Sequence, residues 1–90
     1  MSASISTTHS ALTTTAVLLV AVRVGRATLT IQLLSGAGSN YIGATGVTAA
    51  TGYLLPKTIG GEVSFQGFTG ELWGISDAPS GNSVVIVELF

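Results

Sequence analysis

Short runs in which apolar and polar residues alternate are the feature that most limits what this chain can fold into. In the run TLTIQL, from Thr28 to Leu33, every second residue is apolar. A period of two turns one side of an extended strand toward a core and the other toward solvent, whereas a helix needs a period near 3.6. No segment carries a helical stripe of useful length, so the sequence predicts an all-β protein.

Turn signals separate the strand-like runs, as expected for a sandwich or barrel of short strands. The predicted strands are residues 16–23, 27–34, 40–43, 62–66, 71–76 and 83–90. We expect the first two runs to pair as a hairpin around Gly25, and the fourth and fifth to pair as a second hairpin around residues 67–70. The predicted fold is a small antiparallel β-sandwich or barrel of about seven to eight short strands with an extended N-terminal arm.

The beginning of the chain differs from the rest in composition. Residues 1–15 are mostly Ser and Thr with few apolar anchors, so they cannot bury enough surface to fold alone. We expect residues 1–15 to form an extended or flexible arm and residues 16–90 to form a single β domain. Threonine tolerates the extended backbone, so the arm could lie along a partner as an added strand.

Charged residues are scarce, at 8% of the 90 residues against 47% hydrophobic residues. A soluble domain usually has about 25% charged residues. There is no cysteine to supply a disulfide. Small domains without a covalent cross-link are commonly stabilised by self-association. We therefore expect a homo-oligomer whose surface is largely covered by copies of itself or by another protein.

The same composition argues against several function classes. Only Arg23, Arg26 and Lys57 are positive, too few for the basic stripe that binds nucleic acid. The longest apolar run, residues 16–22, is far shorter than the roughly 20 residues that cross a bilayer, so we expect no membrane partner. His9 is the only histidine and has no acidic residue near it in sequence. We expect no catalytic residue, no cofactor and no metal, and hence no enzyme.

Large apolar side chains outside the predicted core are candidate contact residues. In the register of the second predicted hairpin, Trp73 and Ile75 lie on the more polar face, and large aromatic residues often anchor interfaces. A slip of one residue would turn Trp73 into the core instead, so both interpretations stay open. Further interface candidates are Phe68 at the hairpin tip, Phe90 at the end of the chain, and two apolar residues of the arm, Ile5 and Leu12.

Five segments of the chain also carry a family resemblance: RATLTIQ (26–32), YIGATGVTAATGYLLP (41–56), GEVSF (61–65), ELWGIS (71–76) and VVIVELF (84–90). Together they resemble a group of small virion structural proteins of tailed bacteriophages. The resemblance covers roughly residues 23–90 and leaves the arm outside. One departure is at Leu33 and Leu34, where the family pattern has an asparagine, so the following turn is expected to differ.

Members of this group are capsid decoration (cement) proteins, head fibres or other β modules of the particle surface. The resemblance implies a cement protein that binds the outer surface of the major capsid protein shell and stabilises it. It further implies a location on the capsid surface of the virion, assembly in the host cytoplasm and, by analogy with cement proteins, a homotrimer. The alternative is a head-fibre or tail-fibre module that binds a host receptor or glycan on Trp73, Tyr53 or Phe68.

Overall fold

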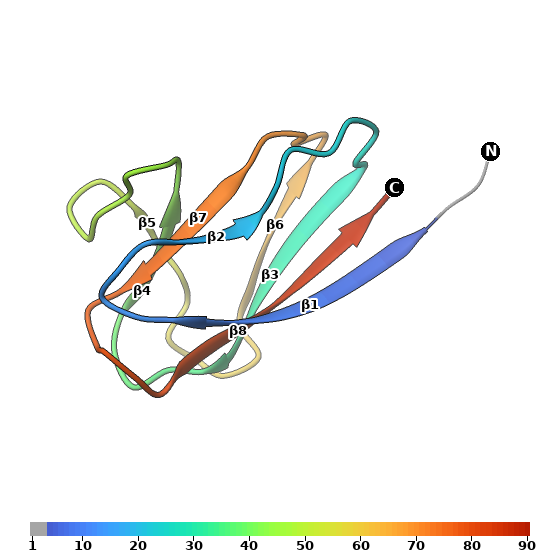
Figure 1. The fold of residues 1–90 in the computed structure, drawn as a ribbon. Helices are drawn as coiled ribbons and strands as arrows, with labels where there is room; N and C mark the ends of the chain where they lie inside the picture. Colours follow the sequence, from blue (N-terminus) through green and yellow to red (C-terminus); the bar gives the residue numbers. More distant parts are fainter. Residues whose placement is uncertain (1–3) are drawn as a thin grey trace.

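The protein is a two-layer β-sandwich, here described for residues 4–90 from a computed structural model (Figure 1). Eight strands form it, and no helix is found within these residues, which confirms the predicted all-β sandwich. The strands are β1 (Ile5–Leu12), β2 (Val17–Val20), β3 (Thr28–Ser35), β4 (Asn40–Gly43), β5 (Tyr53–Leu54), β6 (Glu62–Gln66), β7 (Leu72–Ser76) and β8 (Asn82–Leu89).

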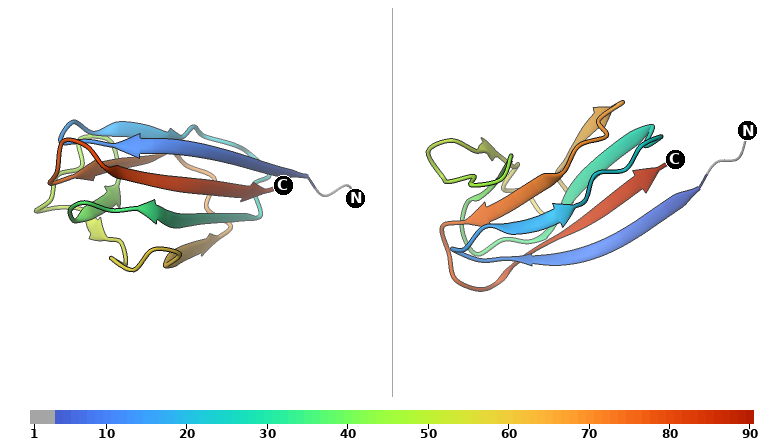
Figure 2. Two further views of the ribbon diagram at one scale, coloured as in Figure 1. Left: turned by 90° about the horizontal axis from the view of Figure 1, so that it is seen from below. Right: turned by 45° about the horizontal axis from the view of Figure 1, so that its top comes forward.

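The strands divide equally between two antiparallel sheets that face each other (Figure 2). Sheet A has the strand order β1-β8-β3-β6, and sheet B has the order β2-β7-β4-β5. Along the chain, every connection except the one from β4 to β5 crosses from one sheet to the other. The core therefore lies between strands that follow one another in sequence but belong to opposite layers.

Both predicted hairpins are wrong. β2 pairs with β7 and not with β3, and β6 pairs with β3 and not with β7. Each pair of runs has an apolar side and a turn between its members, and these features fit two strands that face each other across a core as well as two that pair edge to edge. The segments 21–27 and 67–71 are sheet-to-sheet crossings.

The N-terminal segment belongs to the sandwich. Residues 5–12, assigned from the sequence to an arm outside a domain at 16–90, are extended and pair along their whole length with β8 of the same chain. Backbone hydrogen bonds with β8 hold this Ser/Thr-rich segment, and Leu12 at its end is completely buried. Residues 1–3 of the predicted arm lie outside the described residues.

Period-two alternation places the core. In β3 the apolar residues Leu29, Ile31 and Leu33 are buried, and the polar residues between them are half-buried on the outer side. Gly74 of β7 leaves room for Leu12, because a Cβ at Gly74 would lie 2.7 Å from a methyl carbon of Leu12. The buried core cluster is Leu12, Leu19, Val20, Leu29, Ile31, Leu33, Ile42, Leu55, Leu72, Val84 and Ile86.

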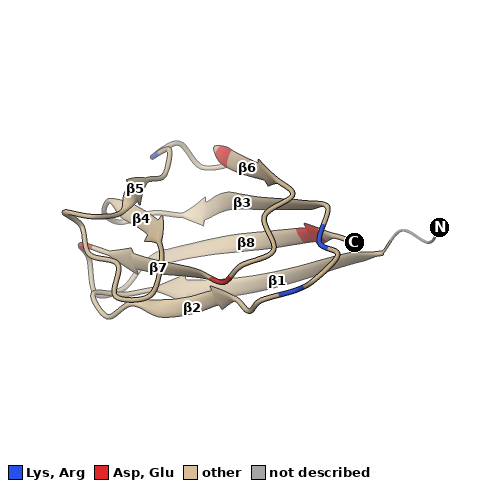
Figure 3. Ribbon diagram, turned by 90° about the horizontal axis from the view of Figure 1, so that it is seen from above, with Lys and Arg blue, Asp and Glu red and all other residues tan. Residues whose placement is uncertain are grey.

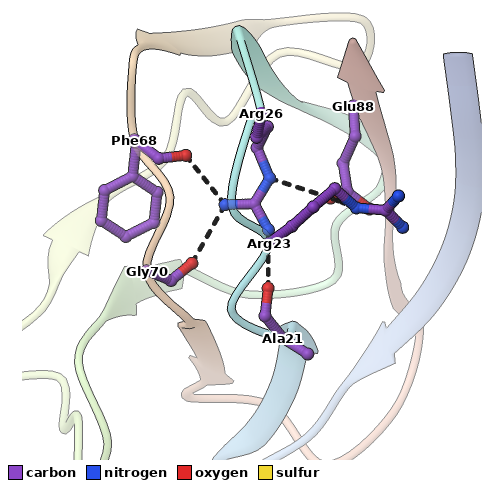
Figure 4. Close-up of polar contacts among 6 residues, drawn as sticks. All are labelled: Ala21, Arg23, Arg26, Phe68, Gly70 and Glu88. Carbon is purple, nitrogen blue, oxygen red and sulfur yellow. Dashed lines mark hydrogen bonds and ion pairs between the residues drawn. The ribbon is translucent and has the colours of Figure 1, made fainter. Parts of the chain in front are cut away.

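A buried arginine ties the two crossings together (Figure 4). The Arg26 guanidinium donates through Nε to Glu88 Oε2 at 2.8 Å, and its other nitrogens donate to the backbone carbonyls of Ala21, Phe68 and Gly70 at 2.6, 2.9 and 3.0 Å. Arg26 is 2% exposed. One planar fork therefore joins both crossings to β8, a task that suits the fixed donor geometry of arginine.

The segment between β4 and β5 is framework. Val47, 5% exposed, packs against two glycines: a Cβ at Gly43 would lie 2.8 Å, and one at Gly52 2.9 Å, from a methyl carbon of Val47. The same Cβ at Gly52 would also lie 2.7 Å from Tyr41 Cβ. Gly43 and Gly52 thus allow the loop to pack closely on β4.

Candidate interaction surfaces

The exposed edge of β1 offers unpaired backbone groups. Ser4 and Phe90 exchange both backbone hydrogen bonds, and the β1–β8 register from Ile5 to Leu12 has no shift. Hydrogen-bonded pairs alternate along an antiparallel ladder, so the even-numbered residues of β1 face β8 and the odd-numbered ones turn their N–H and C=O groups away from it. We call Ile5, Thr7, His9 and Ala11 the outward-pointing residues of β1.

The other three sheet edges carry features that discourage pairing. β2 has four residues and an irregular register between Leu18 and Val20, and β5 has two residues, followed closely by Pro56. β6 has five residues and begins at the exposed Glu62. Short length, bulges, proline and charge are the usual protections of an edge strand. β1 has eight residues, regular pairing, no proline and no Lys, Arg, Asp or Glu.

The outer side of sheet B is the second surface, and its side chains are mostly apolar. Leu18 lies beside Trp73, and Ile75 lies beside Tyr41, which in turn lies beside Leu54. Paired residues of an antiparallel ladder point to the same side, so these five residues share one side, which we call the sheet-B face. Leu18 and Leu54 are 45% and 47% exposed, and the other three are half-buried.

Trp73 lies on this sheet-B face and not in the core cluster. Its indole Nε1 donates a hydrogen bond to Glu71 Oε1 at 3.1 Å, which leaves the carboxylate at the margin of an apolar patch. Of the two positions left open by the sequence, the structure supports the outer one. Whether Trp73 contacts a partner there stays a prediction, and Ile75 shares both its position and that prediction.

The structure brings the other predicted contact residues to different places. Phe68 is half-buried, packs on the core beside Phe65 and lies under Arg26. Phe90 lies beneath the Arg23 guanidinium, 3.8 Å from the ring centroid. Ile5 is 67% exposed at the β1 edge. The prediction that Leu12 is a contact residue is wrong, because its side chain is wholly buried in the core and cannot touch a partner.

The charged residues are few and mostly isolated (Figure 3). Arg23 and Arg26 both contact Glu88 Oε2, at 3.1 and 2.8 Å. The two arginines and Glu88 form one charged cluster. The other four charged side chains of the chain are exposed: Lys57, Glu62, Glu71 and Asp77. Sequence reasoning missed this cluster, and the single charge within the apolar run VVIVELF was the signal for it.

Sites for small ligands or metals are not prominent. Within residues 4–90, no group of three or more His, Cys, Asp and Glu side chains is placed to hold a metal ion. A surface hollow of about 320 Å³ is lined by Ala44, Thr45, Gly46, Val47 and Thr51, which include no ionisable side chain. The described residues also contain no helix long and apolar enough to cross a membrane.

Comparison with known proteins shows a likeness of fold. No protein-family model matches the sequence, and no curated protein matches it. A solved structure from Bacillus endospore appendages, described as a novel family of disulfide-linked pili, is similar to this chain with a TM-score of 0.59. The likeness covers 99% of this chain and 86% of that chain at 14% sequence identity. Two chains with little sequence in common thus share the sandwich.

Proposed function

We propose that this chain is a structural subunit that acts in many copies, by binding copies of itself and a larger protein assembly, and not by catalysis. The observation that carries the proposal is the scarcity of exposed charge. A surface of 4866 Å² holds four exposed charged side chains outside the Arg23–Arg26–Glu88 cluster. The folded chain becomes more stable when another protein covers such a surface, because each bound neighbour favours the folded state by mass action.

The sheet-B face is the surface best suited to that assembly. It combines one tryptophan, one tyrosine and three aliphatic side chains in two neighbouring rows of the sheet. Buried aromatic side chains commonly supply the largest contributions to an interface. We assign this face to the partner protein, with Trp73 as its central anchor.

At a finer level, we propose a capsid decoration protein of a tailed bacteriophage that binds the major capsid protein on the outside of the shell. The support is the resemblance of residues 23–90 to small virion proteins, together with the nearly uncharged surface. In this role the protein is on the surface of the virion and stabilises the shell. A homotrimer is the form implied by analogy with cement proteins.

A second candidate is a subunit of a surface filament, favoured by the fold shared with the endospore appendage protein. That protein is described as part of disulfide-linked pili. The 90 residues of this chain contain no cysteine, so a filament built from them would be held by non-covalent contacts. The filament would use the same outer faces and sheet edges.

Purified particles distinguish these functions. The cement proposal predicts hundreds of copies per particle and a lower rupture temperature for shells that lack the protein. Adding the purified protein back should restore the rupture temperature, whereas a variant with Trp73→Ala should restore it less. A few dozen copies, unchanged rupture and lost adsorption would instead indicate a fibre module that binds a receptor. A continuous filament of this chain alone would indicate the second candidate.

A further inference from the structure

The β1 edge is complementary to itself. Each outward-pointing residue offers one N–H donor and one C=O acceptor, and within residues 4–90 no backbone partner is found for these groups. The edge carries no Lys, Arg, Asp or Glu, so two copies of it would approach without repulsion between such charges. These properties make a second copy of this chain the best matched occupant.

The geometry points to a symmetric pair in which β1 of one copy runs antiparallel to β1 of another. The two-fold axis passes between the Thr8 residues of the two copies, which lie opposite each other. This pairing rests on the broader proposed function, a subunit that acts beside copies of itself. It does not rest on the homotrimer, because a two-fold contact cannot close a ring of three, and a trimer would form through other surfaces. The pairing names the partner and the register of one contact in the assembly.

The register follows from counting hydrogen bonds. In an antiparallel pair, residues that exchange hydrogen bonds lie opposite each other and alternate with pairs that do not. Centring the pair on Thr8 places Thr7 opposite His9 and Ile5 opposite Ala11, each twice by symmetry. All outward-pointing residues are then used, and the ladder gains about eight hydrogen bonds. A shift of two residues in either direction leaves some of these groups without a partner.

Side chains agree with this register. Ile5, 67% exposed, covers Ala11 of the second copy, so an apolar side chain leaves water. His9 faces Thr7 of the second copy, and the two imidazoles are not directly opposite. Thr8 is exposed and lies on the other side of the sheet, where its counterpart is the same residue.

The pair also orients the proposed contact with a shell. Opposed residues in an antiparallel ladder point to the same side. The two A sheets therefore join edge to edge into one continuous sheet, and the outer faces of both copies lie on the same side of it. Both B sheets then lie on the other side, and both sheet-B faces point in the same direction. A pair formed in this way presents two copies of the apolar patch to one surface.

Single-cysteine variants of the full chain test the register, because the protein has no cysteine of its own. In the proposed pair, the two Thr8 Cα atoms are about 4.5 Å apart, as in a pair without mutual hydrogen bonds, and this distance suits a disulfide. The Ser6 Cα atoms of the two copies are about 13 Å apart along the strands, and so are those of Ser10, which is too far for a disulfide. The matched controls are therefore Ser6→Cys and Ser10→Cys.

Under mild oxidation, Thr8→Cys should form covalent dimers at least about tenfold faster than either control. A mixture of Ser6→Cys and Ser10→Cys should form mixed dimers in preference to dimers of one variant. Adding Thr7→Pro to Thr8→Cys should abolish the covalent dimer, because proline removes an outward donor and leaves the β1–β8 ladder intact. Circular dichroism and urea unfolding establish that each variant is folded.

The contrary results are distinct. Faster dimer formation by Ser6→Cys or Ser10→Cys would overturn the register centred on Thr8. An oligomer in solution without a disulfide in any variant would overturn edge pairing and leave the proposed function standing. A monomer at every concentration that also fails to bind shells or form filaments would overturn both.

Discussion

Removing the buried guanidinium of Arg26 should cost a large share of the stability of this protein. The change Arg26→Met leaves the Glu88 carboxylate, in a residue 7% exposed, with Arg23 as its remaining cationic partner. It also removes the donors to the carbonyls of Ala21, Phe68 and Gly70. A domain of this size has a free energy of unfolding of about 5–13 kcal/mol, and breaking a buried ion pair from one side costs about 3–5 kcal/mol.

Three variants separate the ion pair from the carbonyl contacts. Glu88→Gln keeps an oxygen for Arg26 Nε and all three carbonyl bonds but leaves the buried guanidinium without its counter-charge. We therefore expect a loss of about 3 kcal/mol, the low end for a buried ion pair broken from one side. The double variant with Arg26→Met and Glu88→Leu removes both charges but leaves three carbonyls without donors, so we expect a loss of about 3 kcal/mol, at about 1 kcal/mol per bond. The control Arg23→Met removes a partly exposed partner and should cost less than about 1 kcal/mol.

Urea unfolding followed by the fluorescence of Trp73, the single tryptophan, measures these losses. Circular dichroism provides a second probe of the same transition. Full recovery of stability in the double variant would show that the carbonyl contacts contribute nothing. Equal losses for Arg26→Met and Arg23→Met would contradict the assignment of Arg26 as the residue that joins the crossings.

Three further predictions concern the loop, the sheet-B face and β1. Gly52→Ala should lower the free energy of unfolding by about 1–3 kcal/mol, because the added Cβ would meet Tyr41 Cβ and the Thr48 carbonyl. In the control Gly70→Ala the added Cβ meets only the ring of Phe68. The control should therefore lower the free energy of unfolding clearly less in the same urea titration. Trp73→Ala should weaken binding to shells by about 2 kcal/mol and leave the fold intact by circular dichroism. The control Ile59→Ala, at a position 70% exposed, should change neither shell binding nor the fold. Unfolding of the Trp73 variant would instead place that residue in the core. In dilute protein, hydrogen exchange read by NMR should find the even-numbered amides of β1 protected and the odd-numbered ones open, and the reverse order would refute the assigned edge.

Local features of the fold were predictable from the sequence. Alternation in TLTIQL correctly placed Leu29, Ile31 and Leu33 in the core, because a strand has the same period wherever it pairs. Gly25 was expected in a turn, and its φ of 88° is one that glycine adopts at no steric cost. These predictions depend only on neighbours in the chain.

Pairing between strands was not predictable in the same way. The turns at residues 21–27 and 67–71 fit a hairpin and a sheet-to-sheet crossing equally well, and the Arg26 contacts that distinguish them join residues up to 62 positions apart. The N-terminal segment lacks an apolar stripe, so its place in sheet A depends on backbone bonds to β8 that no residue pattern announces. The position of Trp73 stayed open in the sequence, because the hairpin register used to weigh it does not form: β7 pairs with β2 and β4, and not with β6.

Sedimentation of the purified chain over a wide range of concentrations, alone and with empty shells, tests the central claim most directly. A surface with so few charges should be covered by other protein, so the mass should rise above 9.0 kDa as concentration increases, and the chain should sediment with shells. A mass of one chain at all concentrations, with nothing bound to shells, would contradict the account.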